Sequence, residues 1–156
     1  MKITHRLLDP ASDTDMFLIR WACLAPNNVP FGAEDGFDWE SWTPSHTGVK
    51  YIASYVNCVY VGICALIGCG PIVEAHMAYL PEIYGISSKV GKSQLDWIFY
   101  NTEVEEVQAP CLDCNALAKK LILSLGFRPL GVADKMWKKG GEGLMMTIYS
   151  VKRRAK

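Results

Sequence analysis

The clearest candidate for chemistry in this sequence is a glutamate and a histidine two residues apart, Glu74 and His76. They lie in a run, 72–80, that is typical of a β-strand, and side chains two apart on a strand project from the same face. An imidazole beside a carboxylate can abstract a proton while the carboxylate orients the ring. The same spacing also fits a solvated polar face of a sheet, so a base at this position is a hypothesis.

A second chemical signal is the C-x-x-C spacing of Cys111 and Cys114, which zinc and thiol-redox sites use. The sequence has no second pair with matching spacing, and its histidines, at positions 5, 46 and 76, are dispersed. We therefore interpret the two cysteines as part of a tight connection between a strand and the helix at Asn115, and we expect no metal site.

The elements that position these residues follow from hydrophobic periodicity. The predicted strands span 2–8, 50–55, 59–67, 72–80, 104–109, 127–137 and 144–151, with a turn at 56–57, and the predicted helices span 13–23 and about 88–101. Between 25 and 48, Pro, Asn and Gly punctuation around several aromatic residues predicts an irregular or short-helical cover segment. Strands 72–80 and 104–109 flank a helix and should be parallel, joined by a right-handed crossover, whereas the other strands look antiparallel. The predicted fold class is therefore α/β (α+β) with a mixed sheet.

Two helices carry apolar faces that predict how they pack. In 13–23 we expect Phe17, Leu18 and Trp21 to face inward. Another helix is capped by Asn115 and stopped by Gly126, with Phe127 opening the next strand. Its apolar residues recur at spacings of three and four, which predicts one buried face made of Leu117, Ala118, Leu121, Ile122 and Leu125.

The composition favours one domain, 1–156, with a variable N-terminal part (1–49), a core (50–153) and a basic tail (154–156). Lys plus Arg and Asp plus Glu number 16 each, which argues against a nucleic-acid or membrane-surface partner. The N-terminus lacks a signal-peptide profile, and no apolar run reaches the roughly 18–20 residues that span a bilayer. We expect a soluble cytoplasmic protein whose six cysteines are reduced thiols.

The order strand, glycine-containing loop, helix, strand and then N-x-x-A-x-x-L-x-x-x-L-G-F (115–127) resembles the GCN5-related N-acetyltransferase (GNAT) superfamily. The runs E-A-H-M-A-Y-L-P-E-I-Y-G, L-D-W-I-F and M-T-I-Y-S-V-K-R look like the small acetyltransferase-like proteins of tailed bacteriophages. The likeness covers about residues 50–153 well and the first 49 weakly. It implies a mostly antiparallel sheet whose central parallel pair splays into a V-shaped cleft, with helices on both faces.

The resemblance also implies acetyl-CoA or coenzyme A as cofactor. In the family, a loop with the pattern Gln/Arg-x-x-Gly-x-Gly/Ala holds the pyrophosphate by its backbone amides, and the matching positions are Glu82, Gly85 and Ser87. Glu82 departs from this pattern, although Lys89 and Lys92 could offset its charge, and Ser87 or Ser88 could also cap the helix. The implied cofactor-binding residues are Met77, Ala78, Leu80, Tyr84, Gly85, Ile86, Ser87, Ser88 and Asn115.

For catalysis the resemblance implies direct attack of an amine on the thioester, with Glu74 and His76 as the base and backbone N–H groups near Met77 or Ala78 polarising the carbonyl. The family's tyrosine acid falls on Ile122, which cannot donate a proton. A second hypothesis therefore keeps the fold without the chemistry, as a phage virion, head-assembly or binding protein.

The acceptor in the first hypothesis is a small-molecule or protein amine, and the expected location is the bacterial host cytoplasm. Virion components or a second copy of the chain are the partners that the second hypothesis adds. Four acidic residues at positions 34, 35, 38 and 40 fit either a cationic acceptor or an acidic surface loop.

Overall fold

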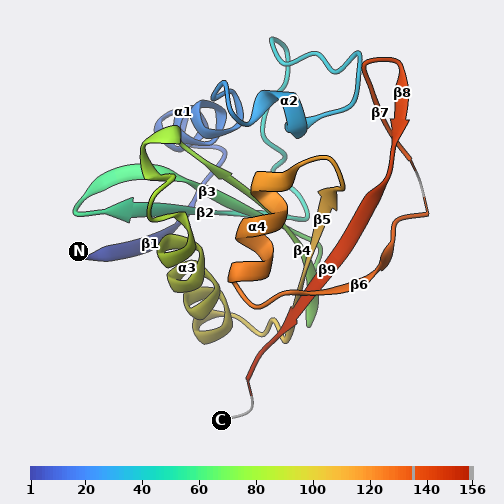
Figure 1. Ribbon diagram of the computed structural model, residues 1–156. Coiled ribbons are helices and arrows are strands. Elements are labelled where there is room, and N and C mark those ends of the chain that lie inside the picture. The colour runs from blue at the N-terminus through green and yellow to red at the C-terminus, as the bar shows by residue number, and fades with distance from the viewer. Residues whose placement is uncertain (135, 155–156) are drawn as a thin grey trace.

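The chain folds around a seven-stranded sheet with helices on both faces (Figure 1). The computed structural model describes residues 1–134 and 136–154. The sheet contains β1 (Ile3–Leu8), β2 (Val49–Val56), β3 (Val59–Ile67), β4 (Ile72–Tyr79), β5 (Glu106–Leu112), β9 (Met146–Lys152) and β6 (Arg128–Val132), in that spatial order. A separate hairpin pairs β7 (Trp137–Lys139) with β8 (Glu142–Leu144). Within the described ranges, β4 and β5 are the parallel pair, as the sequence predicted.

Two hydrophobic layers hold the helices to the sheet. On one face, α3 (Ser87–Asn101) and α4 (Ala116–Ser124) cover a core that includes Val107, Ile98 and Phe127. On the other face, α1 (Asp13–Cys23) packs over Ile63 and its neighbours. The short helix α2 (Val29–Gly32) and the one-turn helix η1 (Pro81–Ile83) lie in connecting segments. The predicted short-helical cover segment is therefore present between α1 and β2.

The inward face of α1 differs from the prediction. Phe17 and Trp21 are 64% and 46% exposed, and the buried residues are Asp15, Ile19 and Ala22. The indole of Trp21 lies on the outside, with its ring 5.5 Å from that of Tyr60. The prediction holds for Leu18, which packs against the core beneath α1, but it was wrong for Phe17 and Trp21. The buried stripe of the helix contains a charged residue, Asp15, which hydrophobic periodicity cannot detect.

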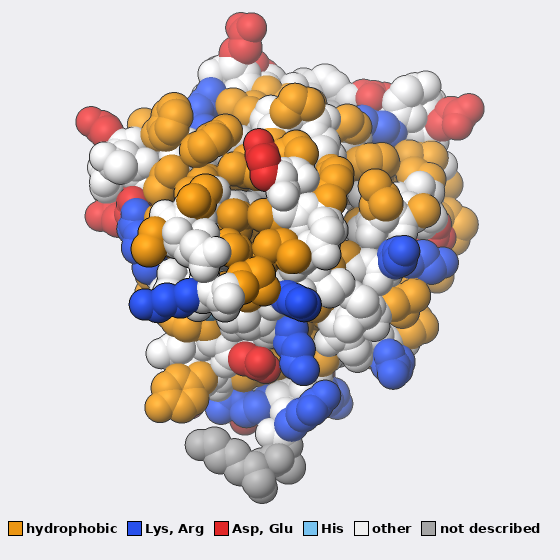
Figure 2. All heavy atoms as spheres, turned by 60° about the vertical axis from the view of Figure 1, so that its left-hand side comes forward, with side chains coloured by type: hydrophobic (Ala, Val, Ile, Leu, Met, Phe, Trp, Pro, Cys, Tyr) orange, Lys and Arg blue, Asp and Glu red, His pale blue; other side chains and the backbone are white. Residues whose placement is uncertain are grey.

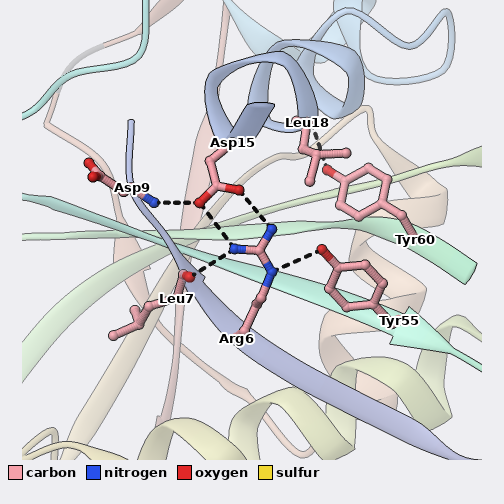
Figure 3. Close-up of polar contacts among 7 residues, drawn as sticks. All are labelled: Arg6, Leu7, Asp9, Asp15, Leu18, Tyr55 and Tyr60. Atoms are coloured by element: carbon pink, nitrogen blue, oxygen red, sulfur yellow. Dashed lines mark hydrogen bonds and ion pairs between the residues drawn. The ribbon is translucent and has the colours of Figure 1, made fainter. Parts of the chain in front are cut away.

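The carboxylate of Asp15 can be buried because the guanidinium of Arg6 donates two hydrogen bonds to it (Figure 3). Arg6 on β1 donates from Nη2 to Oδ1 at 2.7 Å and from Nη1 to Oδ2 at 3.0 Å, and the N–H of Asp9 donates to Oδ2 at 2.9 Å. Arg6 also donates to the hydroxyl of Tyr55 at 3.2 Å. The bidentate pair with Arg6 lowers the pKa of Asp15 in spite of its burial. This pair ties α1 to β1.

Asp15→Asn is expected to destabilise the protein by about 1–3 kcal/mol at neutral pH, because it removes the negative charge that accepts the hydrogen bonds of Arg6. The effect is limited to this size because the side chain of Arg6 is only half buried, and water screens the pair. The native carboxylate has the lower pKa, so its contribution is complete above the unfolded-state pKa of about 4 and is lost as pH falls through the folded-state value. Urea unfolding at pH 7 and at pH 3 measures this. The exposed Asp13→Asn is the control, with an expected change of about 0.5 kcal/mol. An equal Asp15→Asn deficit at both pH values would contradict the assignment.

The turns also differ in detail from the prediction. The β2–β3 turn is at Asn57 and Cys58, both with positive φ (49° and 69°), rather than at 56–57. This two-residue turn with left-handed conformations matches the twist of the hairpin strands. The predicted strand 104–109 is β5, shifted toward the C-terminus.

The two predicted closing strands are each divided. The segment 127–137, of which position 135 lies outside the described residues, contains β6 and only the first residue of β7. The segment 144–151 contains the last residue of β8 and all of β9 except Lys152. The β6–β9 register shifts between Pro129 and Gly131, and the chain then leaves the sheet. Gly140 and Gly141, with φ of 60° and 77°, form the turn of the extra hairpin. A Gly-Gly pair between short runs is a hairpin signal that the prediction did not use. Positions 155 and 156 of the predicted basic tail also lie outside the described residues.

The second apolar helix is confirmed, but its apolar face is only partly buried, and Leu121 packs on a separate small cluster. Asn115 is its N-cap, and Gly126 follows it with a φ of 90°. Ala118, Ile122 and Leu125 pack on the main core, but Leu117 is 73% exposed. Leu117 lies in the first turn, beyond the edge of the sheet-facing stripe. Among the described residues, no helix has the length and apolar character that crossing a membrane requires.

Candidate active site

The central strands β4 and β5 pair over only a short distance. Their parallel register runs from Ile72↔Glu106 to Glu74↔Gln108. Beyond these residues β4 continues to pair with β3 as far as Tyr79, and β5 continues to pair with β9 as far as Leu112. The facing edges of 75–79 and 109–112 therefore have no strand partner within the described part of the chain.

Backbone alternation decides which groups of β4 face this unpaired edge. The N–H of Leu80 donates to the carbonyl of Val61, and the β3–β4 register is continuous, so Ala78 and His76 also direct their backbone groups toward β3. The intervening residue Met77 directs its N–H toward β5. Of the two backbone N–H groups predicted to polarise the carbonyl, that of Met77 faces the unpaired edge and could do so. That of Ala78 faces β3 and could not. The N–H of Leu80 is likewise already used.

Glu74 and His76 lie on the same face of β4, as predicted, and contact each other. His76 Nε2 is 2.5 Å from Glu74 Oε1, and the two side chains are 43% and 48% exposed. The hydrogen bond from His76 lowers the pKa of Glu74. The carboxylate therefore stays ionised at neutral pH and can orient the imidazole. The pair is open to solvent on the face that α1 partly covers, at the level where β4 parts from β5.

The loop after β4 presents free amides at the start of α3. The N–H groups of Gly85, Ser87 and Ser88 have no acceptor among the described residues, whereas the N–H of Ile86 donates to Ile83 at 2.8 Å. Ile86 is the N-cap and contributes no side-chain cap, so the predicted serine caps are absent. The hydroxyl of Ser87 instead donates to the carbonyl of Tyr84, and Ser88 bonds Ser124 on α4. An uncapped helix N-terminus of this kind attracts anions.

The neighbouring side chains of this loop are mostly exposed. Tyr84 is 54% exposed, and Glu82, Lys89 and Lys92 lie on the surface. A Cβ on Gly85 would meet no atom within 4 Å, so space remains beside its amide. The predicted phosphate loop thus combines free N–H groups with room for a ligand.

Asn115 is the N-cap of α4, the helix that follows β5, and Ile122 lies within this helix. Asn115 Oδ1 accepts from the N–H of Ala118 at 3.1 Å, which is the capping role, and its Nδ2 has no acceptor among the described residues. Ile122 is partly buried against the main core. Its apolar side chain leaves this helix without a proton donor at the position where the family has tyrosine.

Three of the four acidic residues of the cover segment make structural contacts, two with the β7–β8 hairpin and one within the segment. Asp35 accepts from the N–H groups of Gly140 and Gly141 at 3.0 and 2.9 Å, and Glu34 accepts from the N–H of Lys138. Asp38 accepts from the backbone and hydroxyl of Ser41. Of the two sequence interpretations, these contacts favour a structural loop over a site for a cationic acceptor.

Two asparagines that the sequence prediction missed contact the end of β4. Asn27 and Asn28 both donate to the carbonyl oxygen of Tyr79, at 2.9 and 3.0 Å. Asn28 also donates to the carbonyl of Ala22 at the end of α1. Consecutive asparagines after a proline are a turn signal, but their long-range partner is visible only in the fold.

Cys111 and Cys114 do not act as a pair in this structure. Cys111 is buried at the end of β5, where burial raises the pKa of its thiol to about 11, whereas Cys114 is exposed. All six cysteines are free. Within 1–134 and 136–154, no group of three or more His, Cys, Asp or Glu side chains could hold a metal ion.

Comparison with known families gives a match over most of the chain. Residues 34–156 match the family described as "Protein of unknown function (DUF2824)". The chain belongs to this family. The matched range contains β2 to β9 and every site residue predicted from the sequence, whereas Asn27 and Asn28 precede it. Among curated proteins, no significant match was found.

Solved structures similar to this DUF2824 chain share its fold at low sequence identity. One is a ribosomal-protein-S5-alanine acetyltransferase from Vibrio fischeri (16% identity, 97% of this chain and 93% of that chain, TM-score 0.72). Another is a spermidine N-acetyltransferase from Vibrio cholerae with CoA and spermine (15%, 96% and 95%, TM-score 0.75). A third is RimJ from Mycobacterium smegmatis with CoA-disulfide (16%, 96% and 81%, TM-score 0.73). The predicted GNAT fold is confirmed.

Proposed function

We propose that this DUF2824 chain is an acetyl-CoA-dependent N-acetyltransferase that transfers the acetyl group to an amine. The observation that carries the proposal is the unpaired edge of β4. It lies between the Glu74–His76 pair and the free amides of Gly85, Ser87 and Ser88. A thioester cofactor laid along this edge would have its phosphates at the start of α3 and its acetyl group near Met77.

Each residue has a chemical role in this proposal. The N–H groups of Gly85, Ser87 and Ser88 hold the pyrophosphate, with Tyr84 and Ile86 alongside. Met77 directs its N–H at the thioester carbonyl, where negative charge develops during attack. His76, oriented by Glu74, takes the proton of the attacking amine directly or through water. Asn115 Nδ2 is free to bind the pantetheine arm.

The comparisons support the proposed classes of cofactor and acceptor. Two of the similar structures contain coenzyme A species, and one contains spermine, an amine. Because identity to them is low, the acceptor of this chain is proposed only as an amine, of a small molecule or a protein. The proposed location is the bacterial host cytoplasm, a proposal that rests on the sequence resemblance to acetyltransferase-like proteins of tailed bacteriophages.

A second candidate function is a non-catalytic one, favoured by two observations. Ile122 provides no acid for the departing thiolate, and Glu82 adds a carboxylate next to the phosphate loop. In this alternative the chain is a phage virion, head-assembly or binding protein that retains the GNAT fold. Cofactor binding followed by a turnover assay separates the two candidates.

Acetyl-CoA is expected to raise the melting temperature of the native chain, because a ligand that binds only the folded state adds about 2.7 kcal/mol at 100 times its Kd. Differential scanning fluorimetry measures this. Gly85→Asp places a carboxylate at the phosphate site and should abolish the shift. Gly85→Ala, whose Cβ meets nothing within 4 Å, is the matched control and should retain it. The absence of any shift at millimolar acetyl-CoA would overturn the proposal.

A further inference from the structure

A fully buried glutamine, Gln94, ties α3 to two strands of the sheet. Its Oε1 accepts from the hydroxyl of Tyr79 at 2.8 Å, and its Nε2 donates to the carbonyl of Ile52 at 3.1 Å and to Ser54 Oγ at 2.8 Å. A carbonyl oxygen can only accept, so the NH2 group must face Ile52 and the hydroxyl of Tyr79 must be the donor. Each polar atom of the amide is therefore used to connect elements.

The hydrogen bonds continue from Gln94 and return to α3. Ser54, which is also fully buried, accepts from Gln94, and the other side-chain partner of its hydroxyl among the described residues is Nδ1 of His5, 3.0 Å away. We therefore assign the hydrogen of Ser54 to Nδ1, which leaves the proton of the neutral ring on Nε2. Nε2 of His5 then donates to the hydroxyl of Ser93 at 2.9 Å. Burial lowers the pKa of His5, which favours the neutral ring that this arrangement requires. The network thus starts at Gln94 and ends at its neighbour Ser93, fixing α3 along the sheet.

Tyr79 is where this network meets the unpaired half of β4. Beyond Glu74, β4 has a strand partner on one side only, and Tyr79 is its last residue. The Tyr79 hydroxyl is held by Gln94 on the α3 side, and its carbonyl is held by Asn27 and Asn28 on the α1 side. The end of the half-paired strand is therefore fixed from both faces of the sheet.

We propose that Gln94 is a positioning residue, which sets the unpaired edge of β4 at a fixed separation from the free amides at the N-terminus of α3. This inference rests on the proposed function, in which coenzyme A spans both places. A ligand that contacts two elements binds best when their separation is fixed beforehand. A ligand that contacts α3 alone gains nothing from Gln94.

The test compares CoA with ADP, which has the pyrophosphate but lacks the pantetheine arm, by titration calorimetry on the full chain. Gln94→Leu removes the whole connection, whereas Tyr79→Phe removes the bond between Gln94 and β4 together with the weaker contact of the same hydroxyl with Met77 Sδ at 3.6 Å. Both variants are expected to raise the Kd for CoA by about tenfold while leaving the Kd for ADP within about twofold. Tyr100→Phe, which removes the hydroxyl of a tyrosine on α3 that is 85% exposed, is the matched control and should change neither Kd.

Comparing the two ligands distinguishes a loss of positioning, which weakens CoA binding alone, from a general loss of structure, which weakens the binding of both. An unchanged CoA affinity in Tyr79→Phe, or an equal loss for CoA and ADP, would overturn the positioning role while leaving the proposed function intact. Tyr79→Phe gives the result even if Gln94→Leu fails to fold. A wild-type chain that binds neither ligand would overturn the proposed function, and the positioning role with it.

Discussion

Replacement of Gly62 by alanine is expected to destabilise the protein by about 3 kcal/mol or more. Gly62 lies in β3 with a φ of 136°, and a Cβ there would be 2.4 Å from the carbonyl oxygen of Ala78 and 2.7 Å from the Cα of Tyr79. These are backbone atoms of the paired strand β4, so a side-chain rotation cannot relieve the contact. One of the two strands must move, or the pairing must break.

Denaturant unfolding monitored by circular dichroism measures this loss. Gly131→Ala is the matched control, because Gly131 has an ordinary φ and a Cβ there would meet no atom within 4 Å. The control should change stability by less than about 1 kcal/mol. Equal unfolding midpoints for Gly62→Ala and the wild type would show that β3 and β4 do not pair in the register described.

His76→Ala is expected to lower kcat/KM for acetyl transfer by about 10²- to 10⁴-fold if the proposed function holds, because it removes the group that takes the proton of the amine. Glu74→Gln should cost less, about tenfold, since the amide can still accept a hydrogen bond from the ring but carries no charge. The double variant should be little worse than His76→Ala, because the carboxylate acts through the imidazole.

Product formation should be followed by mass spectrometry with polyamine and peptide acceptors, because the exposed thiols of Cys58, Cys69 and Cys114 would consume thiol reagents. Glu105→Gln, an exposed carboxylate just before β5, is the control and should leave the rate unchanged. Wild-type rates in both the His76 and Glu74 variants would remove the pair from the mechanism. Cofactor binding without turnover for any acceptor would favour the non-catalytic alternative.

Local patterns were enough to predict most of the fold. Alternating and β-rich runs located β1 to β4, and the Asn115 cap and Gly126 defined α4, because these signals depend on neighbouring residues. The buried position of Asp15 on α1 was missed because it depends on pairing with Arg6, nine residues away. The β7–β8 hairpin was missed because its strands are short, although its Gly-Gly turn was visible.

The candidate site was predictable only in part, for a similar reason. The contact between Glu74 and His76 follows from strand geometry, which acts over two residues. The choice of Met77 over Ala78 depends on which strand each amide faces, and this requires the register with β3. The link from His5 to Ser93 spans 88 positions, and no periodicity in either segment predicts it.

The exposed edge strand β6 affects whether copies of this protein aggregate at high concentration. All five of its residues are exposed, and it ends the sheet on the side away from β1. Such an edge ordinarily invites strands from other molecules and leads to aggregation. Pro129 has no N–H to offer a new strand, and the register shift beside it interrupts the straight ladder that a second sheet would need. Pro129 and the register shift beside it therefore make the exposed edge of β6 a poor template for a strand of another molecule.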